Sequence, residues 1–358
     1  MLTLSFRPTL FLFIALLSAR LFAAPAHAQP YKPEPGPAAA DSLELVLSAA
    51  DAPPRGESAR DIPIRIRFPR DANGPRPLVI FSHGMGGSSA AFPELTDHLA
   101  THGYVVILPT HSDSVKLRRE QGEDAGREIV SNPAAYVRNV KPIERVDDVK
   151  RILDALPFIE KKIFPDAAAS ISRDAIAMAG HSAGAMTTQI IFGVKARTRI
   201  LSGPQSFADP RIKAAVVISG QGTRSRLFTE NSWSDLSKPM LVITGSLDTA
   251  KAGNDTPESR RHPFEYAPAT KGAPHTYLLW IEGATHSSYQ SKSAAALLGE
   301  NPEDPAMVAA VTTSATLAFV DAYVKFPADS DEAKAARAYL AGDAIPTHTS
   351  GKASVLSK

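Results

Sequence analysis

The chain has 358 residues, 44% of them hydrophobic, so it is expected to bury a sizeable core rather than to be disordered. It contains no cysteine, which excludes disulfide frameworks, thiolate metal sites and cysteine nucleophiles. Its 39 basic and 37 acidic side chains give a formal charge of +2, and Arg7 and Arg20 account for that excess. Without the segment that holds these two residues the chain is formally neutral, so its charge does not indicate a nucleic-acid partner.

Residues 1–28 have the features of a secretory signal peptide. Arg7 gives a basic start, an apolar run covers residues 9–22, and Ala26-His27-Ala28 has the small-residue pattern of a cleavage site. The run is short for a membrane-spanning helix, and no later stretch is expected to cross a membrane. We therefore expect cleavage near Ala28, export to the periplasm or the extracellular space, and no stable membrane insertion.

Two segments come before the main pattern of the chain. Residues 29–40 are rich in Pro, Ala and Gly and are expected to form a flexible lead-in. Residues 41–77 include stretches in which apolar and polar side chains alternate, such as residues 62–68. This alternation predicts the edge strands of an antiparallel hairpin.

Short, continuous apolar runs then alternate with helical segments. Runs that are apolar on both faces are typical of a parallel sheet covered by helices on both sides. The predicted strands are residues 78–81, 104–108, 175–179, 214–218, 240–244 and 277–281. The predicted helices are residues 92–102, 143–156, where Pro157 is expected to end the helix, 183–194, 312–324 and 331–341. The alternation predicts one doubly wound α/β domain over residues 41–341, followed by a flexible tail at 342–358.

The strongest chemical signal is the pentapeptide Gly180-His181-Ser182-Ala183-Gly184, which has the pattern G-x-S-x-G. It directly follows a predicted strand and precedes a predicted helix, and this is the setting of a nucleophile elbow. At so sharp a turn the two glycines leave room for the neighbouring chain. The pattern alone also occurs by chance in turns rich in small residues. Its position between strand and helix favours Ser182 as a nucleophile.

A serine hydroxyl needs a general base, and the base needs a carboxylate that orients it. Asp248 and His286 follow Ser182 in the order expected for such an elbow, each just after a predicted strand. The carboxyl ends of strands are where an open α/β sheet has its active site. We therefore predict a Ser182–His286–Asp248 triad. The weaker candidates for the acid and the base are Asp235, Asp255, Glu282, His262, His275 and His348.

Negative charge that develops on a carbonyl oxygen during acyl transfer is normally held by two backbone N–H groups, which form an oxyanion hole. One donor is expected from Ala183, the residue after the nucleophile. The loop after the first predicted parallel strand reads Ser82-His83-Gly84-Met85-Gly86-Gly87-Ser88, and the N–H of Met85 is expected to be the second donor. An ordinary strand-to-helix turn is the alternative for this loop.

The remaining histidines are expected to be structural. His83 and His181 flank the predicted site and are expected to form local hydrogen bonds. The pair His111-x-Asp113 resembles half a metal site, but no third ligand has suitable spacing, so no metal and no cofactor is assigned. The position of this pair after a predicted strand suggests that it lines the substrate pocket. The long polar segment 112–141 is a candidate cap over the site.

These segments resemble the α/β-hydrolase superfamily. Within it they resemble the branch of platelet-activating-factor acetylhydrolases, their bacterial relatives and dienelactone-hydrolase-like proteins. The resemblance covers residues 78 to about 341, and its most similar segments are residues 81–87, 98–106, 145–149, 180–184 and 283–286. It implies an α/β-hydrolase fold, a triad of Ser182, Asp248 and His286, and an oxyanion hole from the N–H groups of Met85 and Ala183.

The function expected from these observations is hydrolysis of a carboxylic ester, in a small molecule or a polymer, through an acyl-enzyme intermediate and without a cofactor. Two alternatives remain open. The same residues suit an amidase or peptidase, and an exported protein of this fold can also be a catalytically silent binding module. Phe92, Trp233 and Tyr289 are candidates for apolar walls of the site. The sequence indicates neither the acyl and alcohol specificity nor the oligomeric state.

Overall fold

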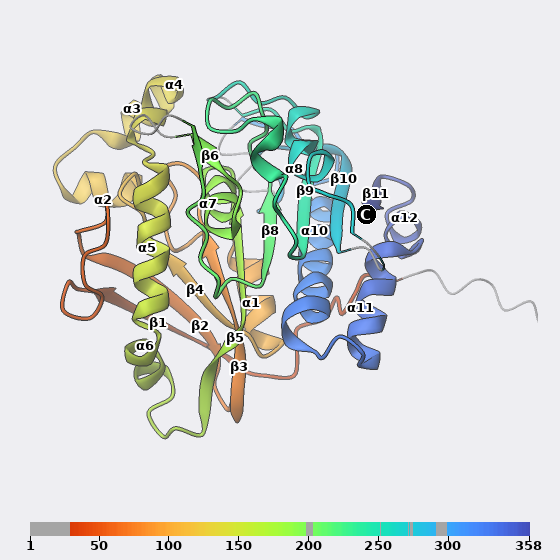
Figure 1. Cartoon of the computed structure of the whole chain (residues 1–358), viewed down its shortest axis with the longest axis horizontal. Coiled ribbons are helices and arrows are strands. Elements are labelled where there is room, and N and C mark those ends of the chain that lie inside the picture. The colour runs from red at the N-terminus through yellow and green to blue at the C-terminus, as the bar shows by residue number, and fades with distance from the viewer. Residues whose placement is uncertain (1–28, 198–202, 251, 271, 273–274, 291–298) are drawn as a thin grey trace, which may run out of the picture.

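A computed structural model describes residues 29–197, 203–250, 252–270, 272, 275–290 and 299–358 of the chain. The signal peptide predicted for residues 1–28 lies outside the described residues. A nine-stranded sheet with the order β1-β2-β4-β3-β5-β8-β9-β10-β11 forms the centre of the fold (Figure 1). The strands are β1 Ala40–Leu47, β2 Ile62–Pro69, β3 Gly74–Ser82, β4 Val105–Pro109, β5 Ala169–His181, β8 Ala214–Ile218, β9 Met240–Leu247, β10 Thr276–Thr285 and β11 Ala353–Ser357.

The middle of the sheet is parallel and its margins are antiparallel. Strands β4, β3, β5, β8, β9 and β10 run in one direction. Strands β1 and β2 form an antiparallel hairpin that joins the sheet through β4, and β11 pairs antiparallel with β10 at the opposite margin. All six predicted inner strands are therefore confirmed, as is the hairpin. A small ribbon of β6 (Ala196–Arg197) and β7 (Pro204–Gln205) lies outside this sheet.

Helices cover both faces of the sheet, because successive residues of the parallel strands point to opposite sides and both sides are apolar. On one face, Ile80 of β3 shares a buried cluster with α5 (Pro142–Asp154), α6 (Leu156–Ile163) and α7 (Ala183–Phe192). On the other face, Val79 shares a second cluster with side chains of three helices. These are α1 Pro93–Thr101, α10 Pro305–Val320 and α11 Asp331–Ala341. The predicted fold class, a mostly parallel sheet between two helical layers, is confirmed.

The helical structure around Pro157 differs from the prediction. Helix α5 does end nearby, at Asp154, but a second helix, α6, begins at Leu156 with the proline in its first turn. A proline is tolerated there because the first N–H groups of a helix have no intrahelical partner. The late helix is also longer than predicted, since α10 begins at Pro305 and continues as a π-helix, η4, over Asp321–Lys325.

Both ends of the described chain contact the rest of the fold. The tail at residues 342–358 forms helix α12 (Ala344–His348) and strand β11, whose Val355 pairs with Leu279 of β10. The lead-in has no helix or strand before Ala40, yet Tyr31 donates a 3.0 Å hydrogen bond to Asp321. The helix and strand in the tail were not predicted, because partners distant in sequence supply contacts that local composition does not reveal; the flexibility of the two segments stays a prediction.

One described segment after the predicted signal peptide is long and apolar enough to cross a membrane, contrary to expectation. It is Pro305–Lys325, which comprises α10 and η4. Of its most apolar stretch, 78% is buried inside the protein, where α10 packs against the sheet (Figure 1). This burial is typical of a core helix.

The predicted cap segment, residues 112–141, consists of short helices. They are α2 Val115–Glu120, α3 Ala125–Ser131, α4 Pro133–Tyr136 and the 3-10 turn η1 Val137–Asn139. They follow β4 in the chain, and Figure 1 shows α3 and α4 beyond the upper end of α5 and α2 to the left of that helix. Two further short elements, η3 (Ser259–Arg261) and α8 (His262–Glu265), lie between β9 and β10 in the chain.

Candidate active site

The turn from β5 to α7 has the geometry of a strained elbow. Ser182 has φ 54° and ψ −117°, a combination that costs a residue with a side chain about 1–3 kcal/mol. A Cβ on Gly180 would overlap the carbonyl of Gly184, and one on Gly184 would overlap the carbonyl of Ser82. The two glycines are therefore required by the close approach of β5, α7 and the end of β3, as the pattern predicted.

The structure brings Ser182, His286 and Asp248 together from the carboxyl ends of β5, β10 and β9. The Nε2 atom of His286 lies 2.9 Å from the Oγ of Ser182, and its Nδ1 atom lies 2.9 Å from Oδ1 of Asp248. Asp248 is fully buried, His286 is 9% exposed and Ser182 is partly exposed. The contacts form one continuous path from the partly exposed Ser182 to the buried Asp248 carboxylate.

The weaker candidates for the acid and the base have other contacts. Asp255 accepts a hydrogen bond from the N–H of Gly222, and Asp235 is exposed and pairs with Lys195. His262 lies 3.0 Å from the hydroxyl of Thr223 rather than near the elbow. Three candidates remain. Glu282 is exposed, His275 lies beside the hydroxyl of Thr276, and His348 contacts the hydroxyl of Tyr339.

The Asp248 carboxylate has a full set of polar partners. Its Oδ2 atom accepts hydrogen bonds of 2.9 Å from Thr244 and from Tyr289, and Arg260 Nε lies 3.1 Å from Oδ1. Burial alone would raise the pKa of this carboxyl, but the Arg260 charge and the hydrogen bonds from His286 and Ser219 hold the pKa below its usual range. Asp248 is therefore ionised at neutral pH.

Ser219 is part of this group, and sequence reasoning missed it. It directly follows β8, and its Oγ donates a 2.8 Å hydrogen bond to Asp248 Oδ1 and lies 2.7 Å from His286 Nδ1. Its backbone has φ 52°, which is unfavourable for a residue other than glycine. Its position at the carboxyl end of a parallel strand is the signal that would have pointed to it. Arg260 carried no such signal, because it lies within η3 in the loop after β9.

His181 contacts the backbone of His286. Its Nε2 donates a 2.7 Å hydrogen bond to the carbonyl of His286, and its ring lies between those of Phe92 and His286, with centroid distances of 5.3 and 4.9 Å. Burial, followed by the neighbouring His286, lowers the pKa of His181 to about 3, so its ring is neutral. The prediction that this histidine forms a local hydrogen bond is confirmed.

The three candidate wall residues, Phe92, Trp233 and Tyr289, are at most 2% exposed.

The loop His83–Gly87, here called the oxyanion loop, lies against the elbow. A Cβ built on Gly84 would be 3.6 Å from the Cβ of Ser182. Within the part of the chain that the structure describes, the Met85 N–H has no hydrogen-bond partner. The Ala183 N–H is the first of α7 and has no intrahelical partner either. Neither predicted donor therefore has a hydrogen-bond partner among the described residues.

His83 fixes the conformation of the oxyanion loop. Its Nδ1 donates a 2.6 Å hydrogen bond to the carbonyl of Gly84, and its Nε2 accepts a 3.0 Å bond from the N–H of His111. Burial and then the nearby Arg145 charge hold the pKa of His83 well below its usual value. A neutral ring with one donor and one acceptor nitrogen satisfies both contacts, which confirms the prediction of local hydrogen bonding.

The cap segment packs on the same loop. The N–H of Val115 donates a 3.0 Å hydrogen bond to the carbonyl of Gly86, and a Cβ on Gly86 would overlap the side chain of Ile129 in α3. The short helices therefore contact Gly86, the residue next to the predicted donor Met85.

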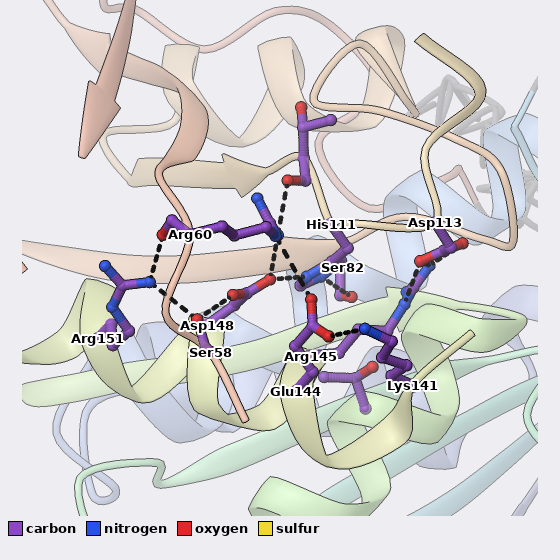
Figure 2. A network of polar contacts seen from close by, with 12 residues as sticks. Ser58, Arg60, Ser82, His111, Asp113, Lys141, Glu144, Arg145, Asp148 and Arg151 are labelled. Atoms are coloured by element: carbon purple, nitrogen blue, oxygen red, sulfur yellow. Dashed lines mark hydrogen bonds and ion pairs between the residues drawn. The ribbon is translucent and has the colours of Figure 1, made fainter. Parts of the chain in front are cut away.

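His111 and Asp113 do not line a pocket, contrary to expectation, because they are 0% and 1% exposed. His111 lies between Ser82 and Asp148, with Nε2 2.9 Å from the Ser82 hydroxyl and Nδ1 2.8 Å from the Asp148 carboxylate (Figure 2). Asp113 pairs with Arg145. Both side chains lie in buried polar networks next to the oxyanion loop. Their polar atoms form hydrogen bonds with neighbouring side chains and with the loop backbone. Among the described residues, no three histidine or carboxylate side chains are grouped as metal ligands.

Comparison with known proteins agrees with this architecture. A family model described as the alpha/beta hydrolase family matches residues 79–342, which run from β3 through α11. No curated protein matches the sequence. The matched region contains the elbow, the oxyanion loop and the strand ends that carry Asp248 and His286. The chain belongs to the alpha/beta hydrolase family.

Proposed function

We propose that the protein is an exported serine hydrolase that cleaves carboxylic esters through an acyl-enzyme intermediate. Ser182 is the nucleophile, His286 the general base and Asp248 the carboxylate that orients it. Membership of the alpha/beta hydrolase family supports hydrolysis as the reaction class. The observation that carries the finer proposal is the continuous path of 2.9 Å contacts from Ser182 through His286 to Asp248.

In the first half of the reaction, Ser182 Oγ attacks the acyl carbon while its proton passes to His286 Nε2. The imidazolium that forms is stabilised by the ionised Asp248. The tetrahedral intermediate carries negative charge on the former carbonyl oxygen, and the N–H groups of Met85 and Ala183 are the donors proposed to hold it. As this intermediate collapses, His286 returns the proton to the departing alcohol, which leaves an ester of Ser182.

In the second half, water replaces the alcohol. His286 Nε2 removes a proton from the water, whose oxygen attacks the acyl carbon and forms a second tetrahedral intermediate. Collapse of that intermediate returns the proton to Ser182 Oγ and releases the carboxylic acid. The cycle consumes one water and needs no cofactor, because His286 accepts and returns every proton.

The finer family branch and the location are part of the proposal. We place the chain in the branch of platelet-activating-factor acetylhydrolases and dienelactone-hydrolase-like proteins, on the sequence of the oxyanion loop and of Arg145-Val146-Asp147-Asp148-Val149. The absence of cysteine excludes the thiol nucleophile of true dienelactone hydrolases. Export rests on residues 1–28, with cleavage near Ala28.

Active-site labelling tests the proposal. We expect a fluorophosphonate to form an adduct on Ser182, located by peptide mass spectrometry, and Ser182→Ala to form none. A panel of p-nitrophenyl esters of increasing acyl length, run with the same pair, should show hydrolysis by the wild type alone and should reveal the preferred chain length. An absence of adduct, together with equal rates for both proteins, would favour a silent binding module. Matched amide substrates separate an esterase from an amidase.

A further inference from the structure

A buried ion pair between Arg145 of α5 and Asp113 holds the oxyanion loop on both sides of Met85. We propose that Arg145 and Asp113 are positioning residues that aim the Met85 N–H at the oxyanion of the transition state. The inference rests on the proposed function, because it assigns a role in that reaction. Figure 2 shows this pair beside the Asp148–His111–Ser82 network.

Arg145 reaches two carbonyls of the loop. It is 1% exposed, and its Nη1 donates a 2.8 Å hydrogen bond to the carbonyl of His83. Its Nη2 lies 3.3 Å from the carbonyl of Gly84 and also donates to Asp113 Oδ2 at 2.8 Å, while its Nε donates to Asp113 Oδ1 at 2.9 Å. The planar guanidinium therefore binds the carboxylate with two nitrogens and the loop with two.

Asp113 holds the other side of Met85. Its Oδ2 accepts a 2.9 Å hydrogen bond from the N–H of Gly86, and Tyr136 of the cap segment donates a 2.6 Å bond to its backbone carbonyl. Burial alone would raise the pKa of this carboxyl, but the Arg145 charge holds the pKa below its usual range. Asp113 is thus an ionised anchor fixed by both the cap segment and α5.

The orientation of one peptide unit follows from these contacts. In a trans peptide the C=O and the N–H point in opposite directions, and the described residues contain no cis peptide. The Gly84 carbonyl points to Arg145 and His83, so the N–H of Met85 in the same unit points away from them. Gly84 itself lies against Ser182. Rotation of this peptide would turn the donor away from the place where the oxyanion forms.

Stability alone does not account for this choice of residues. A buried ion pair contributes little net stability, because removing two charges from water costs about as much as their attraction returns. An apolar pair of similar volume would fill the space but would leave the His83 carbonyl without its donor, and the Gly84 carbonyl with only His83 and the Gly87 N–H. The rigid fork of an arginine, by contrast, fixes the directions of several acceptors at once.

Kinetics of Arg145→Lys and Asp113→Asn test the inference with p-nitrophenyl esters. A lysine cannot contact both carbonyls and the carboxylate together, so we expect kcat to fall by about 10- to 100-fold, somewhat less than on deletion of an oxyanion donor. KM should change little, because the substrate carbonyl is neutral in the ground state. The Ki of a trifluoromethyl ketone, whose adduct with Ser182 carries an oxyanion, should rise by the same factor as kcat falls.

Arg151→Lys is the matched control. Arg151 lies on the same helix, is also 1% exposed, and donates to the carbonyls of Ala52, Pro53 and Arg60 instead of the oxyanion loop. Its replacement should lower the thermal unfolding temperature as Arg145→Lys does, but leave kcat and Ki within about twofold of the wild type.

Four results separate the outcomes. Wild-type kcat and Ki in folded Arg145→Lys would overturn the inference, and so would an equal loss of kcat in Arg151→Lys. If Arg145→Lys does not fold, Asp113→Asn decides, because its amide oxygen can still accept from Gly86 while the charge that fixes Arg145 is gone. An inactive wild type that forms no Ser182 adduct would instead overturn the proposed function, and this inference with it.

Discussion

The hydroxyl of Ser219 donates a 2.8 Å hydrogen bond to the carboxylate of Asp248, at the point where that carboxylate meets His286 Nδ1. Arg260 completes the arrangement, since it donates a 2.7 Å bond to the carbonyl of Ser219 and also lies beside Asp248. The unfavourable φ of Ser219 is thus maintained by two contacts, one from its hydroxyl to Asp248 and one from Arg260 to its carbonyl. Such over-determined strain is characteristic of functional sites.

Removing the Ser219 hydroxyl should lower activity. We expect Ser219→Ala to reduce kcat by about tenfold, the equivalent of one lost hydrogen bond to a charged group. Ser219→Gly lacks the same hydroxyl but accepts a positive φ, so it should lose as much kcat while unfolding at a higher temperature than Ser219→Ala. Steady-state kinetics and thermal unfolding of the two variants check this. Unchanged kcat in both would show that Asp248 and His286 are oriented without Ser219.

Asp248→Asn should lower kcat by about 10⁴-fold, the loss seen when the triad carboxylate of a serine protease is made neutral. The amide can donate to His286 Nδ1 and so favours the tautomer that cannot accept the Ser182 proton. Asp255→Asn is the control, because Asp255 lies in the same loop region but binds Gly222. A similar loss of kcat in both variants would contradict the assignment of the triad acid.

Stability should fall as the pH is lowered from 7 to 4. His181 has a pKa of about 3 when folded, below its value of about 6.5 in the unfolded chain, so between these values the unfolded state binds more protons. Unfolding therefore becomes easier as the pH falls through this window. Urea unfolding at several pH values measures the slope. His181→Gln keeps a donor for the His286 carbonyl but cannot titrate, so its slope should be shallower; an unchanged slope would exclude His181 as a contributor.

The C-terminal strand should contribute to stability rather than to chemistry. Removal of residues 350–358 deletes β11, including Ala353, which is 1% exposed, and leaves the edge of β10 unpaired. We expect a lower thermal unfolding temperature, with kcat at 20 °C close to the full-length value for the molecules that remain folded. Loss of kcat without loss of stability would assign these residues to the site instead.

The mature protein should begin at Gln29. Intact mass and N-terminal sequencing of protein recovered from the periplasm or the medium check the cleavage site, and replacement of Ala28 with a bulky residue should leave the leader attached. Recovery of the uncleaved chain from the cytosol alone would contradict export.

Local patterns predicted the inner sheet, and they also predicted which three side chains, Ser182, His286 and Asp248, lie together at its edge. A strand buried on both faces must be apolar throughout, and Asp248 and His286 directly follow such strands, so their position could be predicted without knowing any loop. Ser219 meets the same criterion. Arg145 and Arg260 do not follow a strand. Their partners lie far from them in the sequence, so these contacts can be seen only in the folded structure. The same is true of β11, whose short sequence gains its partner from a strand far back in the chain.

The contact between Tyr31 and Asp321 joins residues 290 positions apart, and β11 completes the sheet with almost the last residues of the chain. A chain that emerges from its N-terminus onward therefore cannot close this fold until residues 353–357 have been synthesised. Contacts of such high sequence separation close the longest loops and so carry the largest loop-closure entropy. Until then the apolar inner strands lack their outer cover, so the nascent chain is the state most exposed to aggregation, and the two ends act together as the final closure of the domain.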